Sequence, residues 1–144
     1  MVDTLKNIYI MSSYLTFYLQ RKNEKPITLI SYSRSDELYQ YFYENTNMKE
    51  DVQYDTEYYT TISCEDVDDV ISELTQSINN INTRIIEYEK HVDGNIEIID
   101  EIISLKDYLE TLNDTLIRTR FIKDLVLEAN HGYADYTAVL CNIS

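Results

Sequence analysis

The chain has 144 residues, of which 44% are hydrophobic, so it is long enough for one domain with its own core. Its 26 acidic residues against 12 basic ones give a formal charge of −14. This charge argues against proteins that hold nucleic acid or anionic membranes through a basic surface. No apolar run reaches the roughly 18 residues of a membrane span. Asp3 stands where a signal peptide carries basic residues. We therefore expect a cytoplasmic protein, in the host cytoplasm if the gene is viral.

Few residues in the sequence can form the tight loops that bind phosphates. The chain has two glycines and one proline, and the isolated Gly94 and Gly132 form neither a P-loop nor a dinucleotide-binding loop. Isoleucine, tyrosine and asparagine are all frequent, and all three have AT-rich codons. This composition is compatible with a phage or mobile element of an AT-rich host. Met11 is a second candidate start of translation.

Two neighbouring segments predict a β-hairpin at the front of the chain. Residues 14–19 and 27–32 are rich in β-branched and aromatic residues, and a polar turn over residues 21–26 separates them. Residues 58–62 and 136–143 read as two further strands. Because two strands alone are marginal in water, we expect all four to share one sheet.

A short helix is predicted after the second strand. Ser35 has the residue type of an N-cap, and the acidic Asp36 and Glu37 follow it in the first turn. Leu38, Tyr41 and Phe42 then recur at helical spacing. We expect the helix to end near residues 45–47.

The middle of the chain carries the strongest pattern. Ser63 and Asp66 resemble a capping box, and an apolar seam with heptad spacing follows them. The a positions of this first seam are Ile71, Ile78, Ile85 and Val92, and its d positions are Val67, Leu74, Ile81 and Tyr88. A second seam then runs through Ile98, Ile102, Leu105, Leu109, Leu112 and Leu116. Beyond it, Ile117, Phe121, Ile122, Leu125 and Val126 continue an apolar helical face.

The two seams are out of phase, and Asp93-Gly94-Asn95 lies between them. Glycine after a helix and asparagine before the next one are typical of a tight turn between two helices. We therefore expect antiparallel helices over residues 65–92 and 96–129. One continuous helix with a phase slip at Gly94 is the alternative.

The seams allow two modes of packing. Ile99, Ile103 and Tyr108 widen the apolar face of the second helix, which predicts packing against both the first helix and the sheet. In the other arrangement, two hairpins associate into a homodimeric four-helix bundle. Arg84 and Glu89 form the one suitable charge pair beside the first seam.

The candidate chemical groups are too scattered to form a recognisable site. Cys64, His91, His131 and Cys141 lack the short spacings of metal ligands, and the two cysteines make no disulfide framework. In the second helix, acids seven residues apart occupy the outer f position, which favours a solvated surface: Asp100, Asp107 and Asp114. We therefore expect no catalytic residues, no metal and no cofactor, and the protein is interpreted as a non-enzyme.

The candidate partner-binding surface interleaves acids with tyrosines. Its predicted members are Glu50, Asp51, Tyr54, Asp55, Glu57, Tyr58, Asp66, Asp69 and Glu73. Tyrosines ringed by carboxylates suit a basic groove on a partner protein. The first hypothesis is a protein–protein interaction or assembly module. The alternative is an acidic nucleic-acid mimic that inhibits a basic DNA- or RNA-binding protein, such as a nuclease.

Taken together, these patterns predict an α+β fold in a single domain, residues 1–144. Residues 1–62 and 136–144 form a small antiparallel sheet of about four strands with a short helix. Residues 63–130 form a long, coiled-coil-like antiparallel helical hairpin.

Overall fold

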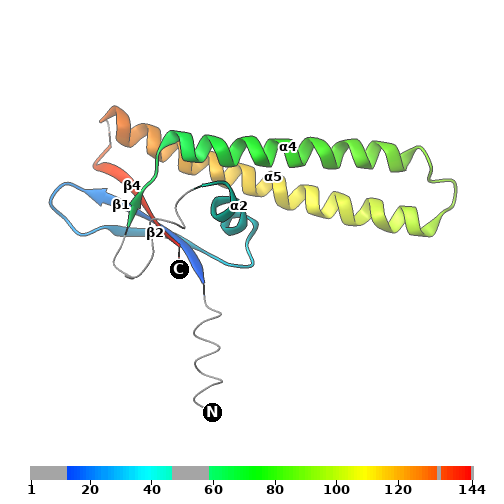
Figure 1. The fold of residues 1–144 in the computed structure, drawn as a ribbon, viewed down its shortest axis with the longest axis horizontal. Coiled ribbons are helices and arrows are strands. Elements are labelled where there is room, and N and C mark those ends of the chain that lie inside the picture. The colour runs from blue at the N-terminus through cyan, green and yellow to red at the C-terminus, as the bar shows by residue number, and fades with distance from the viewer. Residues whose placement is uncertain (1–12, 47–58, 133, 144) are drawn as a thin grey trace, which may run out of the picture.

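The computed structural model describes residues 13–46, 59–132 and 134–143. Its elements are β1 (Tyr14–Arg21), β2 (Ile27–Ser33), α2 (Glu37–Asn45), β3 (Thr60–Thr61), α4 (Cys64–Glu89), α5 (Ile96–His131) and β4 (Tyr136–Ile143). The strands form one antiparallel sheet in the order β2-β1-β4-β3, and α4 and α5 lie side by side as a hairpin (Figure 1). The predicted α+β fold is confirmed, and one continuous helix is wrong.

The sheet is completed by the strand that lies last in the sequence. β4 pairs with β1 on one side and with β3 on the other. Leu15 and Phe17 of β1 are fully buried, and they lie opposite Ile143 and Cys141 of β4, which are also buried. Because alternate residues of a strand share a face, these four side chains form the sheet side of the core.

The short helix α2 begins one residue later than the sequence predicts. Its N-cap is Asp36, whose side chain accepts a hydrogen bond from the Leu38 amide at 2.9 Å. The prediction of Ser35 as N-cap is wrong, because the Ser35 hydroxyl lies 2.8 Å from that of Ser33 and caps no helix amide that the structure describes. Phe42 of α2 meets Phe17 edge-on, with the ring centroids 5.4 Å apart, and so joins the helix to the sheet.

The predicted capping box starts α4. The Ser63 hydroxyl accepts a hydrogen bond from the Asp66 amide at 3.1 Å, and the Asp66 carboxylate accepts one from the Ser63 amide at 3.2 Å. The helix ends at Glu89 rather than at residue 92. The turn is as expected, since Gly94 has a φ of +77° and Asn95 caps the first amides of α5.

The buried face of α5 differs from the predicted one beyond residue 112. Ile117 and Phe121 are exposed, whereas Thr115 and Thr119 are fully buried. The threonine hydroxyls donate hydrogen bonds to backbone carbonyls four residues earlier in the same helix, each at 2.8 Å. A polar side chain that is satisfied within its own helix can be buried at little cost, so these threonines take the core positions.

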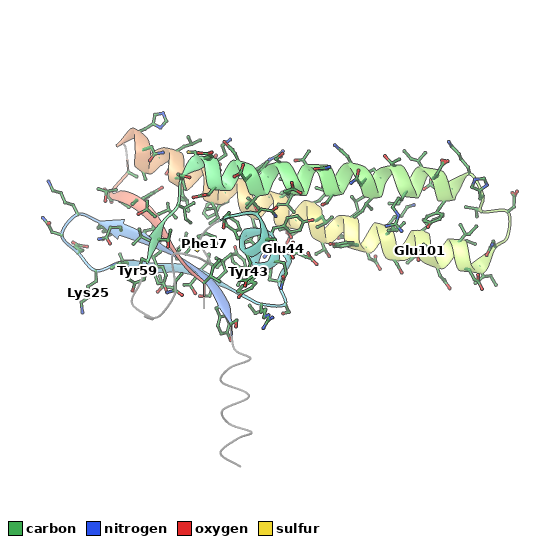
Figure 2. The ribbon with its side chains drawn as sticks, in the orientation of Figure 1. Phe17, Lys25, Tyr43, Glu44, Tyr59 and Glu101 are labelled. Atoms are coloured by element: carbon green, nitrogen blue, oxygen red, sulfur yellow. The ribbon has the colours of Figure 1, made fainter. Side chains whose placement is uncertain are left out.

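The hairpin extends well past the sheet and α2 (Figure 1). Glu101 of α5 lies in this projecting part, whereas Phe17 lies on the sheet beneath the other end of the hairpin (Figure 2). Among the residues described, no helix is both long enough and apolar enough to cross a membrane.

Removal of the capping box tests the start of α4. We expect Ser63→Ala to lower the free energy of unfolding by about 1 kcal/mol, because the Asp66 amide loses its acceptor. Urea denaturation followed by circular dichroism measures this change. Ser104→Ala, at an exposed position within α5, is the matched control and should not destabilise the protein. Equal losses in both variants would contradict the assigned cap.

Candidate functional site

The predicted acidic surface is only partly within the structure. Glu50, Asp51, Tyr54, Asp55, Glu57 and Tyr58 lie outside the described residues. Asp66 serves the capping box, so its carboxylate already has a structural role. Asp69 and Glu73 are exposed, one turn apart on α4. The acidic surface therefore remains a prediction for which the structure supplies two exposed carboxylates.

The cysteines and histidines do not assemble into a site. Cys141 is buried in β4, and this burial raises the pKa of its thiol. Cys64 lies at the start of α4, where the Asn130 amide approaches its sulfur at 3.7 Å. Within the described ranges, no group of three His, Cys, Asp or Glu side chains is placed to hold a metal ion.

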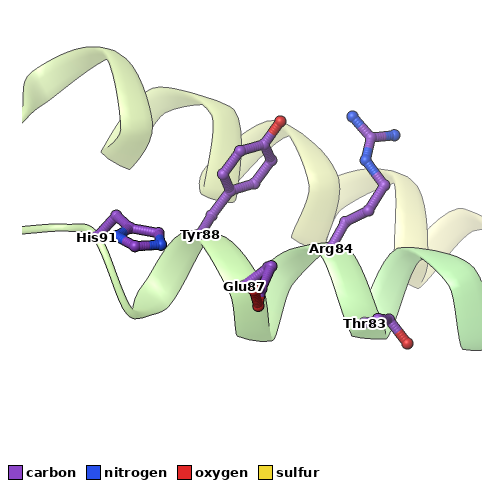
Figure 3. Close-up of a pocket in the computed structure, with 5 residues that line it drawn as sticks. All are labelled: Thr83, Arg84, Glu87, Tyr88 and His91. Carbon is purple, nitrogen blue, oxygen red and sulfur yellow. The ribbon is translucent and has the colours of Figure 1, made fainter.

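A shallow pocket of about 290 Å³ lies on α4 near the tip of the hairpin. Its lining residues all come from one helical stretch and its end: Thr83, Arg84, Glu87, Tyr88 and His91. Figure 3 shows the Tyr88 ring and the Arg84 side chain extending over α5. Arg84 pairs with Glu101 at 3.7 Å, and Glu87 pairs with Lys90 at 3.4 Å. Because neighbours already compensate both charges, the pocket is better suited to an apolar contact than to an ionic ligand.

Two ion pairs cross the hairpin between its helices. Glu89 pairs with Lys106 of α5 at 3.5 Å. Arg84 pairs with Glu101. Glu89 and Lys106 both occupy heptad position e of their helices, and Arg84 and Glu101 both occupy position g. Contacts between like positions are expected for antiparallel helices. The hairpin therefore has two distinct sides, a g side and an e side.

The g side of the hairpin faces α2. The Tyr41 hydroxyl of α2 donates a hydrogen bond to the Ser77 hydroxyl of α4 at 2.9 Å. Tyr108 of α5 contacts Glu37 and Tyr41 of α2, and burial, with these neighbours, raises the pKa of Tyr108 to about 12. Tyr108 therefore packs on α2, whereas the sequence predicts packing on the first helix and the sheet, and its side chain stays partly exposed.

Arg118 joins the hairpin to the rest of the fold. Its guanidinium donates to the Asp36 carboxylate at 3.0 Å and stacks on the Tyr32 ring, 5.0 Å from the centroid. Its Nε approaches Asp114 at 3.2 Å as an ion pair, without the alignment of a hydrogen bond. Burial lowers the pKa of Arg118, but Asp36 outweighs this effect, and the pKa is raised overall. Sequence reasoning missed this residue, since no pattern linked α5 to the α2 cap.

The e side of the hairpin carries exposed isoleucines. Ile99 and Ile103, which we expected to pack within the fold, are 38% and 53% exposed. Ile96 and Ile117 on α5 are 73% and 66% exposed, and Ile86 on α4 is also exposed. We call Ile86, Ile96, Ile99, Ile103 and Ile117 the outer isoleucine face. Since α2 and the sheet lie against the opposite side, no described element covers this face.

The comparisons with known proteins give no further guide. The chain matches no family model, no curated protein and no solved structure. The arrangement of its own residues therefore carries the functional argument.

Arg118→Met tests the connection between the hairpin and α2. We expect it to lower the free energy of unfolding by about 1–3 kcal/mol, because Asp36 loses its main charged partner in a partly buried position. Denaturant titration measures this loss. Arg84→Met, which removes an exposed ion pair, is the control and should change stability by less than about 1 kcal/mol. An unchanged free energy of unfolding in Arg118→Met would contradict the role given to this contact.

The raised pKa values of Tyr108 and Tyr136 predict that the folded protein loses stability in alkali. Burial and the hydrogen bond to Glu128 raise the pKa of Tyr136 to about 12, as burial does for Tyr108. A tyrosine in the unfolded chain titrates near 10, so the folded state holds these protons more tightly. The stabilisation is therefore complete below pH 10 and decreases as the pH rises from 10 to 12. The urea midpoint followed over this range measures the loss, and Tyr136→Phe should flatten its slope.

Proposed function

We propose that this chain is a non-enzymatic protein–protein interaction or assembly module, and that the outer isoleucine face of its hairpin is the contact surface. The observation that carries the proposal is the exposure of five isoleucines on one side of the hairpin. Exposed apolar groups on a folded protein cost free energy, and several of them on one side of a helix pair indicate an interaction surface more strongly than singly scattered ones do. A cytoplasmic location is part of this proposal.

The rest of the hairpin is consistent with a contact element. Its g side is used internally, through Ser77 and Tyr108. Its helices pack through a buried apolar seam that includes Ile81, Ile85 and Leu105, and exposed ion pairs of Arg84 with Glu101 and of Lys106 with Glu89 cross it. A rigid pair of helices presents a preorganised surface, so little conformational entropy is lost on binding.

The charge of −14 supports a second candidate, an acidic mimic of nucleic acid. Asp100, Asp107 and Asp114 form a row of exposed acids along α5. Their spacing of seven residues is about 10 Å along the helix, which is sparser than the phosphates of DNA. We therefore rank this function below apolar assembly, as an outcome that the following experiment can detect.

A single added charge tests the outer isoleucine face. We expect Ile99→Asp to abolish retention of the partner when the tagged protein is used for capture from lysate of the source cell, because the aspartate would have to be desolvated in the contact. Ser104→Asp places the same charge elsewhere on α5 and should leave retention unchanged. Mass spectrometry identifies the bound proteins after low-salt and high-salt washes.

The outcomes of this capture separate the two candidates. Retention that survives high salt and is lost in Ile99→Asp supports the apolar contact. A basic nucleic-acid enzyme that is released by salt, and that both variants still bind, contradicts it and supports the mimic. Equal retention of any partner by wild type and Ile99→Asp would remove the outer isoleucine face from the proposal.

A further inference from the structure

The outer side of α5 carries a second heptad series beside the buried one. If the buried residues of α5 are assigned to heptad positions a and d, the residues at positions b and e also recur at alternating spacings of three and four residues. They are Ile96, Ile99, Ile103, Lys106, Glu110, Asn113, Ile117, Arg120 and Asp124. The isoleucines of this series are all exposed. Helix α5 thus presents a seam of coiled-coil spacing whose isoleucines no described element covers, while its Lys106 pairs with Glu89 of α4 at 3.5 Å.

The outer seam is partly complementary to itself when read backwards. Lys106 and Glu110 lie at equal distances on either side of residue 108, and so do Ile99 and Ile117. If a second α5 runs antiparallel across this point, Lys106 meets Glu110 of the second copy and Ile99 meets Ile117. In the same register Ile103 meets Asn113 and Ile96 meets Arg120, so the apolar match is confined to Ile99 and Ile117. Each contact then occurs twice about a two-fold axis, as an isologous interface requires.

The outer seam itself carries no net charge, because Lys106 and Arg120 balance Glu110 and Asp124. Residues 74–83 of α4 contain no charged residue, although the whole chain carries −14. The acids at the f position of α5 lie beside the b positions of the outer seam, about 40° away around the helix, so they flank a partner that packs on it. Like charges at this rim oppose the approach of two copies, and the apolar contact must outweigh that repulsion.

We propose that the partner of the outer isoleucine face is a second copy of this chain, packed antiparallel with its α5 crossing the first near residue 108 to form a four-helix bundle. This inference rests on the proposed function, because it names the occupant of the same face. A hairpin face about 40 Å long and two helices wide, about 20 Å, offers roughly 800 Å² per chain, which is the size of a stable protein–protein interface.

Analytical ultracentrifugation of the full chain tests the dimer. Wild type should sediment as a dimer at concentrations near 100 µM, and Ile99→Asp and Ile117→Asp should each weaken the dimer by about tenfold or more. Both positions are exposed, so the helical circular dichroism should stay unchanged. Ile27→Ser, which removes an exposed isoleucine from β2, is the control and should remain dimeric. Higher salt should tighten the dimer, since it screens the repulsion between two acidic chains.

Cysteine pairing tests the antiparallel register. In a Cys64→Ser background, a mixture of Ile99→Cys and Ile117→Cys proteins should form a heterodisulfide under mild oxidation. Each protein alone should crosslink far less, because a cysteine and its own copy lie far apart along the antiparallel pair. Crosslinking of Ile99→Cys with itself would overturn the antiparallel arrangement.

The failure of this inference is distinguishable from failure of the proposed function. A wild-type monomer at 100 µM overturns the dimer. If Ile99→Asp still loses a captured protein in that case, the outer isoleucine face is a contact surface for another protein, and the proposed function stands. If neither self-association nor capture depends on Ile99, both proposals fail.

Discussion

The fold depends on the return of the chain along the hairpin, because β4 can enter the sheet only when α5 brings it back. β4 pairs with both β1 and β3, yet it is separated from β3 by the whole of α4 and α5. At about 1.5 Å per residue, the 26 residues of α4 extend roughly 39 Å and the 36 residues of α5 return roughly 54 Å. The longer second helix carries the chain past the start of α4, to the level of the sheet.

This constraint makes the sheet and the hairpin interdependent. The buried side chains of β4, Val139, Cys141 and Ile143, fill the centre of the sheet only after the helices have paired. The core of β1 would otherwise lack its neighbour on that side, since Leu15 and Phe17 lie opposite β4 residues. The hairpin is built from contacts between helices that follow each other in the chain, and its formation brings β4 close to β1, which lies far away in the sequence.

The two sides of the hairpin have different roles because the anchoring contacts are all on one of them. Ser77 and Tyr108 contact α2, and Arg118 reaches the cap of α2 and the ring of Tyr32. These contacts leave the projecting part of the hairpin and its outer isoleucine face without a described neighbour. The basic side chains of the hairpin pair mostly with its own acids. Affinity for a partner would therefore come from apolar area, while the uncompensated acids would limit which partners can approach.

The sequence by itself determined the elements that depend on local periodicity. The strands, the capping box at Ser63 and the turn at Gly94 could be located because each rests on residues close together in the chain. The two seams predicted that the helices pair, since a stripe with heptad spacing must be buried against something. The acidic surface around Glu50 stays a prediction, as most of its residues lie outside the described ranges.

Only the tertiary structure decided which neighbour covers each side of a helix. A periodic pattern places residues relative to one another on a helix, but it does not say which flank the sheet occupies. Ile117 and Phe121 therefore read as core and are exposed, whereas Thr115 and Thr119 read as polar and are buried with their hydroxyls bonded within α5. Arg118 could not be found for the same reason, because its partner Asp36 is 82 residues away in the chain and meets it only after folding.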